Sequence, residues 1–315
     1  MKNIIWIVGG GYMAKEYAKV LKAQDKKFIV VDKTNKEAEF FKEEYGAELI
    51  SGGLENILKT KVKIKTAIIT TTIDILSKCC IELLKHGTNN ILLEKPGALN
   101  INDLKKIKMI SKKKNANVHI AYNRRFYQSV IKLKQSINKN EKITGCFVDF
   151  TERSELISKS KLSKEAKEKM IYSNSSHMFD LFFYLCGHPK KLSSYNKGKI
   201  KWHPTGSVFS GSGLTINNTL FSYFADWGSA GRWKIDIRTN KRNFILQPIE
   251  ELKLMQKKSF EIVNLNINSE LDIMFKPGLY LQTKSFLHKR FSNFCTIDYQ
   301  IESFKYLKKI GSYNE

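Results

Sequence analysis

The feature that most constrains the fold is an alternation of short apolar runs with helix-like stretches over the first 122 residues. The first run, residues 4–8, is short, continuously apolar and rich in β-branched side chains, which is typical of a strand buried on both faces of a parallel sheet. The runs cover residues 4–8, 28–31, 66–72, 90–93 and 118–122. Helix-like stretches separate them, at about residues 12–23, 36–45, 76–86 and 101–114. This order predicts a doubly wound parallel sheet with helices on both faces.

The second half of the chain has a different rhythm. A helix over about residues 127–137 leads into a strand at 143–150, and a polar segment follows at 153–169. Another helix is expected from Ser175 to about residue 185, with Gly187 as its C-cap. Residues 192–265 alternate like strands of an antiparallel sheet with one buried face, and the last stretch returns to helix. We therefore expect an α/β protein of two domains, residues 1–122 and 123–315.

The charge of the chain is strongly positive, at +24. It comes from 47 lysines and only seven arginines, and the lysines are scattered over helix-like stretches as on ordinary solvated surfaces. An anionic substrate or partner is the alternative explanation. Proteins that read nucleic acids rely on arginine contacts to bases and phosphates, and the sequence has no surface of clustered arginines and aromatic residues. A basic nucleic-acid-binding protein therefore remains only a remote alternative.

The cysteines and the N-terminus indicate where such a chain works. The five cysteines are an odd number without any CxxC spacing, which favours reduced thiols and gives no support for a metal site. The apolar run at residues 4–8 is too short for a signal peptide and ends in three glycines. No stretch approaches the roughly 20 apolar residues of a membrane span. We expect a cytoplasmic protein with no membrane contact.

A glycine-rich turn follows the first predicted strand. Gly9, Gly11 and Ala14 fit the pattern GxGxxG/A, which needs a tight turn, a close approach of the backbone to a pyrophosphate, and close helix packing. The following helix offers free N–H groups to phosphates. Asp32 ends the second strand, where a carboxylate accepts from ribose hydroxyls and repels a 2′-phosphate. The turn predicts binding of NAD in preference to NADP.

Three further motifs occur in order along the chain. Glu94-Lys95-Pro96 ends the fourth strand, residues 121–126 (AYNRRF) end the fifth, and residues 175–180 (SSHMFD) begin a helix of the second domain. Together with the glycine turn, they resemble the Gfo/Idh/MocA family of oxidoreductases. The resemblance is clear over residues 3–190 and loose beyond. It implies a Rossmann domain followed by a substrate-binding and oligomerisation domain with a large, mostly antiparallel sheet. The active site is then expected between the domains.

The resemblance also implies roles for individual residues. Lys95 matches the lysine that contacts the substrate hydroxyl and the nicotinamide ribose. Oxidation of an alcohol needs a proton acceptor and a positive charge near the oxygen, and His177 has a pKa suited to accepting that proton near neutral pH. Lys95 and His177 are therefore the expected catalytic residues. Asp180 lies three residues after His177, where it would orient the histidine, bind substrate or pair structurally.

The remaining expected contacts fall into two groups. The expected cofactor contacts are Gly9, Gly11, Tyr12, Met13, Asp32, Lys33, Thr70, Thr71, Thr72, Glu94 and Lys95. The expected substrate contacts are Asp180, Tyr122, Asn123, Arg124, Arg125 and Asn174. Arg124 and Arg125 are placed to meet an anionic group, although we expect at least one of them to be structural.

The sequence departs from the family pattern at several positions. Ser173 stands where many members have an aspartate four residues before the histidine, and Ser175 replaces a frequent glycine. Thr72 replaces the proline that usually follows Thr71, and Leu76 replaces a frequent histidine. The acid–base groups are then reduced to Lys95 and His177, which leaves the substrate and the direction of reaction open.

The expected function is reversible NAD(H)-linked oxidation of a secondary alcohol on a sugar, a sugar phosphate or a nucleotide sugar, as in the synthesis of surface polysaccharides. The basic composition favours a phosphorylated substrate. NAD-assisted cleavage of a glycosidic bond or reduction of a tetrapyrrole on the same fold is the alternative. A homodimer or homotetramer is also expected, because one face of the strands at 205–248, near Phe221, Tyr223 and Trp233, looks too apolar for water.

Overall fold

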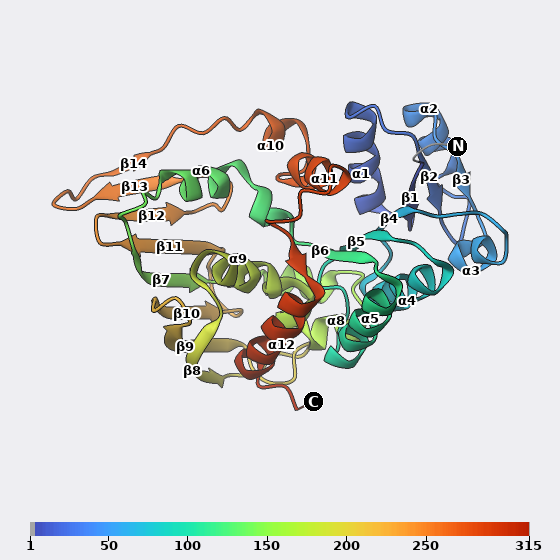
Figure 1. Ribbon diagram of the computed structural model, residues 1–315. Helices are drawn as coiled ribbons and strands as arrows, with labels where there is room; N and C mark the ends of the chain where they lie inside the picture. Colours follow the sequence, from blue (N-terminus) through green and yellow to red (C-terminus); the bar gives the residue numbers. More distant parts are fainter. Residues whose placement is uncertain (1–3, 315) are drawn as a thin grey trace. The chain divides into compact units, whose positions relative to one another are not determined.

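A computed structural model describes residues 4–314, which form two compact units (Figure 1). Unit 1 contains residues 4–123 and Ile273–Ile301, and unit 2 contains Arg124–Asp272 and residues 302–314. The sequence assigns residues 273–301 to the second domain, whereas the structure groups them with unit 1. The reason is local: β15 (Cys295–Thr296) pairs with β6 (Asn117–Ala121), and α11 (Leu279–Leu287) packs on α1 (Tyr12–Ala23).

Unit 1 is built on a seven-stranded sheet in the order β15-β6-β5-β4-β1-β2-β3. Six of its strands are parallel, and only β15 is antiparallel. The other strands are β1 (Ile5–Val8), β2 (Phe28–Val31), β3 (Leu49–Ile50), β4 (Thr66–Ile69) and β5 (Asn90–Glu94). The other helical segments are α2 (Ala38–Tyr45), α3 (Gly53–Leu58), η1 (Ile73–Ile75), α4 (Leu76–His86), α5 (Ile101–Lys114) and η2 (Asn123–Phe126), the last of which continues into unit 2.

This strand order confirms the predicted doubly wound sheet. The order 3-2-1-4-5-6 reverses between β1 and β4, and ligands of such sheets bind at the carboxyl ends of the strands where the order reverses. The core is continuous across the face that α3, α4 and α5 cover, where side chains of β1, β4 and β5 pack against them. Asn100 caps α5 by accepting a hydrogen bond from the Asp103 amide (2.8 Å).

Unit 2 is built on an eight-stranded sheet in the order β14-β13-β12-β11-β7-β10-β9-β8. Only the pair β7/β10 is parallel, which confirms the predicted mostly antiparallel sheet. The strands are β7 (Ile143–Asp149), β8 (Pro189–Lys197), β9 (Val208–Thr215), β10 (Leu220–Asp226), β11 (Lys234–Thr239), β12 (Arg242–Leu246), β13 (Lys253–Gln256) and β14 (Ile262–Asn264). The helical segments are α6 (Gln128–Ser136), α7 (Ser154–Lys159), α8 (Lys164–Glu168), η3 (Ile171–Ser175) and α9 (Ser176–Cys186), while α10 (Glu270–Met274) and α12 (Ile297–Gly311) continue from one unit into the other.

One face of this sheet is covered by the apolar helix α9. Its Phe182 ring lies 4.9 Å from Phe221, and its Phe179 ring lies 5.6 Å from Tyr223. The prediction that Phe221 and Tyr223 mark an exposed face is therefore wrong, because these residues alternate inward along β10. The outward-facing apolar residues of this region are Tyr195, Leu220 and Phe224.

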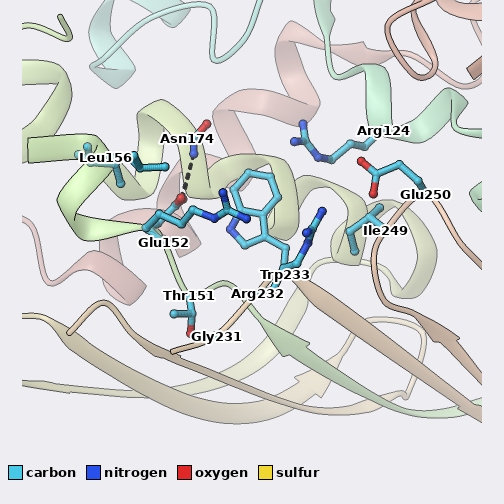
Figure 2. A pocket seen from close by; sticks show the side chains of 12 residues that line it. Arg124, Thr151, Glu152, Leu156, Asn174, Gly231, Arg232, Trp233, Ile249 and Glu250 are labelled. Atoms are coloured by element: carbon cyan, nitrogen blue, oxygen red, sulfur yellow. Dashed lines mark hydrogen bonds between the residues drawn. The ribbon is translucent and has the colours of Figure 1, made fainter. Parts of the chain in front are cut away.

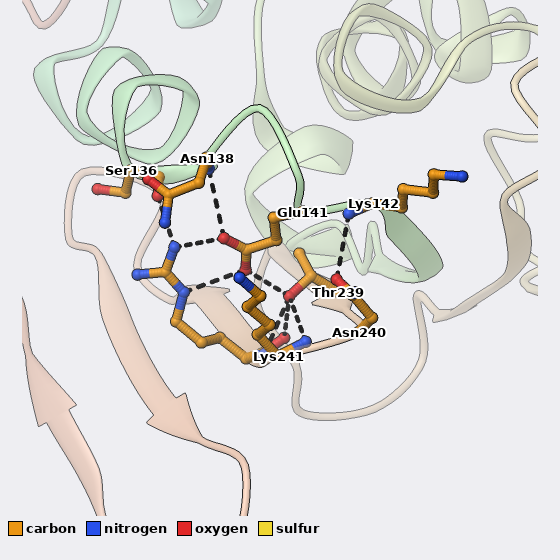
Figure 3. Close-up of polar contacts among 8 residues, drawn as sticks. Ser136, Asn138, Glu141, Lys142, Thr239, Asn240 and Lys241 are labelled. Carbon is orange, nitrogen blue, oxygen red and sulfur yellow. Dashed lines mark hydrogen bonds and ion pairs between the residues drawn. The ribbon is translucent and has the colours of Figure 1, made fainter.

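A buried carboxylate fixes the turn between β11 and β12 (Figure 3). Glu141 accepts hydrogen bonds from Arg242 and from the Thr239 hydroxyl (2.6 Å), and Arg242 also donates to the Ser136 carbonyl (2.6 Å). The hydrogen bond from Arg242 is the main reason that the pKa of Glu141 is lowered to about 2. This network ties the end of α6 to the sheet, and the Arg242 guanidinium is engaged by Glu141 and the Ser136 carbonyl.

No helix within residues 4–314 combines the length and the apolar character needed to cross a bilayer.

Candidate active site

The glycine turn lies at the point where the strand order of unit 1 reverses. Gly9 has φ +102°, and a Cβ there would lie 2.8 Å from the Thr71 amide nitrogen, so only glycine fits. Thr70, at the end of β4, donates its hydroxyl proton to the carbonyls of Val8 (3.2 Å) and Gly9 (2.9 Å). These contacts lock the ends of β1 and β4 together, and Thr72 follows as the residue that precedes η1.

Asp32 is held by the same turn. Its Oδ2 accepts a hydrogen bond from the Gly10 amide (3.1 Å), and its Oδ1 accepts one from the Lys33 amide (2.5 Å). A Cβ at Gly10 would lie only 2.6 Å from Asp32 Oδ2, so this glycine is needed for the carboxylate to reach the turn. The Lys33 side chain is exposed. The structure thus brings the predicted phosphate-binding turn and the predicted ribose acceptor into direct contact.

Gly11 differs from its two neighbours because nothing lies within 4 Å of the position that its Cβ would take. It is the N-cap of α1, and the first turn of that helix has no acidic side chain. Tyr12 is exposed and Met13 is half-buried in the same turn. The fold itself does not require a glycine here, but the close approach of a pyrophosphate to the free amides of a helix N-terminus does. The described residues therefore fit a dinucleotide.

The end of β5 is braced by two buried residues from distant parts of unit 1. The Tyr17 hydroxyl donates to Glu94 (2.9 Å), and burial raises the pKa of Glu94. The Gln300 amide donates to the Pro96 carbonyl (2.9 Å) and to the Tyr122 hydroxyl (2.9 Å). Lys95 thus lies between two anchored neighbours and is itself only half-buried.

Two predicted substrate contacts of unit 1 are occupied within that unit. Tyr122 is buried in the hydrophobic core, where its hydroxyl accepts the hydrogen bond from Gln300. Asn123 is also buried, and its side-chain amide donates to the Pro277 carbonyl (2.9 Å). Both side chains therefore have structural contacts, and their role toward a substrate stays a prediction.

In unit 2, Arg125 and Asp180 form a buried ion pair. Arg125 donates from Nε to Asp180 Oδ2 (2.8 Å) and from Nη2 to Oδ1 (2.6 Å), and both side chains are almost fully inaccessible. Two parallel hydrogen bonds of this kind hold α9 against the start of α6. Asp180 is thus committed to Arg125, which favours the structural pairing among the roles that the sequence left open. Arg125 is the structural one of the two adjacent arginines.

The segment before α9 is a turn of π-helix, η3. Such wide turns are rare and frequent at functional sites. Asn174 and Ser175 both donate to Glu152, at 3.0–3.1 Å and 2.8 Å. Ser173 points elsewhere and donates to the Ala166 carbonyl (2.7 Å). A buried carboxylate from the end of β7 therefore accompanies the motif that lacks an aspartate at position 173.

A pocket of about 420 Å³ opens beside this carboxylate, entirely within unit 2 (Figure 2). Figure 2 shows Arg124, Glu152, Trp233 and Glu250 around it, and its wall also includes Asn174. The ring of His177 lies 6.1 Å from that of Trp233, so the candidate catalytic histidine borders the pocket wall. The structure thus groups Arg124, Asn174 and His177, and it keeps Arg125 and Asp180 as a separate buried pair.

Sequence reasoning missed four residues of these sites. Gly10, Tyr17, Glu152 and Gln300 each contact a predicted site residue or motif. Only Gly10 had a local signal, since it stands inside the glycine run. The other three lie 22 or more positions from their partners, and no short motif links them.

Comparisons with known proteins agree with this geometry. Residues 4–122 match the GFO_IDH_MocA model, described as "Oxidoreductase family, NAD-binding Rossmann fold". A search of curated protein sequences found no match to this chain.

Solved structures of low sequence identity share the fold over nearly the whole chain. Levoglucosan dehydrogenase in complex with NADH is 14% identical, with a TM-score of 0.79, covering 98% of this chain and 96% of that one. UDP-N-acetylglucosamine 3-dehydrogenase from Acidithiobacillus ferrooxidans is 14% identical, with a TM-score of 0.76 and the same coverage. A Desulfitobacterium hafniense protein described as an NADPH-dependent oxidoreductase is 14% identical, with a TM-score of 0.80, covering 99% of this chain and 96% of that one. The family match and the geometry of the glycine turn identify unit 1 as an NAD-binding Rossmann domain similar to that of the Gfo/Idh/MocA oxidoreductases, and the solved structures show that the fold they share extends over nearly the whole chain.

Proposed function

We propose that this chain catalyses the reversible, NAD(H)-dependent oxidation of a secondary alcohol on a sugar-type substrate. The observation that carries the proposal is the pocket of unit 2, whose lining residue Trp233 packs against His177, in a chain whose other unit is an NAD-binding domain. A pocket of this size is in the range of small-molecule sites. The dehydrogenases of levoglucosan and of UDP-N-acetylglucosamine share the fold and support a sugar as the substrate.

The dinucleotide would be held by unit 1. The amides at the start of α1 bind its phosphates above Gly11, and Asp32 accepts from the adenosine ribose hydroxyls. A 2′-phosphate would meet the Asp32 carboxylate, so NAD(H) is preferred over NADP(H). When bound, the nicotinamide ring supplies the hydride acceptor or donor of the reaction.

The chain itself must handle the proton and the charge on the substrate oxygen. In this proposal His177 accepts the hydroxyl proton during oxidation and returns it during reduction. The Lys95 ammonium stabilises the negative charge that develops on the oxygen. On either side of Lys95, Tyr17 holds the Glu94 side chain and Gln300 holds the Pro96 carbonyl. Glu152 holds the turn that precedes His177.

A substrate screen tests this function. The protein is mixed with NAD⁺ or NADH and with sugars, sugar phosphates and nucleotide sugars, and absorbance at the reduced-nicotinamide band is followed. A stoichiometric change in NADH with one sugar class is the expected result. Cleavage of a glycoside without a net change in NADH, or oxidation of NADH by a tetrapyrrole and not by any sugar, would instead support the alternative chemistries. NADH binding without any turnover would contradict the proposal.

We also propose that the chain works as a homodimer or homotetramer in the cytoplasm. The outer face of the unit 2 sheet exposes Tyr195, Leu220 and Phe224, which favours contact with a second copy. All five cysteines are buried thiols that form no disulfide, as suits a reducing compartment.

A further inference from the structure

Arginines are concentrated at the pocket of unit 2. The chain has 54 basic residues, of which only seven are arginines, and Arg124, Arg153 and Arg232 all line this one pocket. They come from three separate stretches: the segment before α6, the N-cap of α7 and the loop before β11. Three of the seven arginines thus line one cavity of about 420 Å³.

None of these three guanidinium groups is paired with a carboxylate of the described residues. Among the described residues 4–314, none of the three forms an ion pair, whereas Arg125 pairs with Asp180 and Arg242 with Glu141. Arg153 and Arg232 are exposed at the pocket, and Arg124 is half-buried. Arginine stays charged at any physiological pH, so the pocket carries three guanidinium groups, each a planar array of hydrogen-bond donors.

The pocket holds two of these arginines in place without neutralising them. The Arg124 guanidinium lies 4.5 Å from the Trp233 ring centre, a stacked arrangement that leaves its N–H groups available. Gly231 packs so closely on Thr151 that a Cβ there would lie 2.7 Å from its side chain, which fixes the loop that carries Arg232. Ordering donors before binding lowers the entropic cost of recognition.

The carboxylates of the pocket do not cancel this charge. Glu152 is already engaged by the Asn174 amide and the Ser175 hydroxyl, and Glu250 is exposed. Three arginines against two carboxylates leave the pocket net positive, next to the wall that His177 borders.

We infer that Arg124, Arg153 and Arg232 bind the phosphoryl group of a phosphorylated sugar, either a sugar phosphate or a nucleoside diphosphate sugar. This inference rests on the proposed oxidoreductase function and narrows its substrate class. A carboxylate is satisfied by one bidentate arginine, whereas a phosphoryl group carries up to two charges and three acceptor oxygens. Three guanidinium groups around one pocket therefore match a phosphoryl group better than the carboxylate of a sugar acid.

The test measures binding to the NADH-loaded protein by calorimetry. Glucose 6-phosphate and UDP-N-acetylglucosamine are compared with glucose and N-acetylglucosamine, and inorganic pyrophosphate is the minimal anion. We expect pyrophosphate and at least one phosphorylated sugar to bind tenfold or more tightly than the uncharged sugars. Stronger binding of UDP-N-acetylglucosamine than of glucose 6-phosphate would identify the diphosphate source, and the reverse would identify the monophosphate.

Substitutions of the pocket arginines test whether these residues bind the phosphorylated probe. Arg153→Gln and Arg232→Gln should each weaken binding of the phosphorylated probe about tenfold or more, because each removes a charge-assisted donor. Arg238→Gln is the matched control, since Arg238 is an exposed arginine of the same unit outside the pocket, and it should bind like the wild type. Equal binding by all three variants, or no preference for phosphorylated probes, would overturn the inference.

The same measurements separate this inference from the proposed function. Oxidation of an uncharged sugar by wild type and by both pocket variants at equal rates would leave the function standing and overturn the phosphate site. Tight, arginine-dependent binding of pyrophosphate without any NADH-linked turnover on any sugar would leave the anion site standing and contradict the function.

Discussion

The two units differ in how their functional residues are assembled. In unit 1 the site is local in sequence, because one turn of three glycines and the ends of adjacent parallel strands meet at the reversal of strand order. In unit 2 the pocket is built from five separate stretches between Arg124 and Glu250, held together by a mostly antiparallel sheet. The residues expected to bind the cofactor can therefore be found from short sequence motifs, whereas the residues of the substrate pocket come together only through tertiary packing.

If catalysis draws on both units, one substitution in each should have the largest effect. Lys95→Ala and His177→Ala should each lower turnover by about 10²–10³-fold, because each removes a group that acts on the reacting oxygen. Steady-state kinetics on the substrate found in the screen measures this loss. NADH binding should persist in both variants, since neither contacts the glycine turn.

The double variant sharpens this test. Its loss should be smaller than the product of the two single losses, because residues that serve one proton transfer are not additive. Near-wild-type rates for both single variants would contradict their assignment as catalytic residues.

A substitution at Gly11 can test cofactor binding by unit 1 without disturbing the folding of that unit. Gly11→Val should leave the thermal midpoint of unfolding nearly unchanged, because the space beside Gly11 is open, but it should weaken NADH binding at least tenfold by filling that space. Fluorescence titration with NADH measures the affinity. Gly145→Ala, in ordinary contact at 3.8 Å in unit 2, is the control and should bind NADH normally. A Gly11→Val protein with unchanged affinity would remove Gly11 from the cofactor site.

The helices and strands could be predicted where the sequence pattern is local, and not where tertiary packing decides. The bounds of β2, α4 and α5 are as expected, because each follows a clear apolar pattern, and α5 also begins at the capping residue Asn100. The two-residue strands β3 and β15 are too short to leave a pattern, and β15 joins the first sheet only through pairing with β6. The helices α7 and α8 lie in a polar stretch where packing, not propensity, decides.

The residues of the candidate sites could likewise be predicted only where a local motif marks them. Asp32 was predictable because it ends a strand, whereas Glu152 has no motif and is identified only by its hydrogen bonds from Asn174 and Ser175. Likewise, nothing local indicates that Asp180 faces Arg125, 55 positions away, or that Arg153 and Arg232 share a pocket.

Acid should destabilise both units, and unit 2 more steeply. Burial lowers the pKa to about 4 for His119 of unit 1 and for His188 and His203 of unit 2. Between about pH 6.5 and pH 4 the unfolded chain binds protons that these folded histidines do not, so stability falls as pH falls through this window. Raised pKa values of the buried Glu94 and Asp236 oppose the trend, because those carboxyls gain protons more readily when folded.

Tryptophan fluorescence measures this difference, because Trp6 is the single tryptophan of unit 1 among the described residues and the other three lie in unit 2. Denaturant unfolding at pH 7.5 and pH 4.5 should show a larger drop in the fluorescence midpoint than in the circular dichroism midpoint. His119→Phe should reduce the acid sensitivity of unit 1 alone, since its ring stacks on Phe291 at 4.2 Å in an apolar site. Equal unfolding midpoints at pH 7.5 and pH 4.5 would contradict the lowered pKa values of these buried histidines.

The smallest expected effect concerns assembly. Phe224→Asp places a charge on the outer face of the unit 2 sheet and should shift the mass toward the monomer while leaving unit 1 able to bind NADH. Light scattering at micromolar concentration measures the mass. A monomeric wild type would contradict the proposed oligomer, and an unchanged oligomer in Phe224→Asp would place the interface elsewhere.

The most direct test of the cofactor assignment is a parallel titration of NADH and NADPH into the wild-type protein and into Asp32→Ser. The wild type should bind NADH more tightly than NADPH, because Asp32 accepts from the ribose hydroxyls and repels a 2′-phosphate. Asp32→Ser should narrow this preference, by weakening NADH binding and relieving the repulsion of NADPH. Failure of the wild type to bind either dinucleotide, or NADPH binding as tight as that of NADH, would contradict the roles of the glycine turn and Asp32 in holding NAD(H).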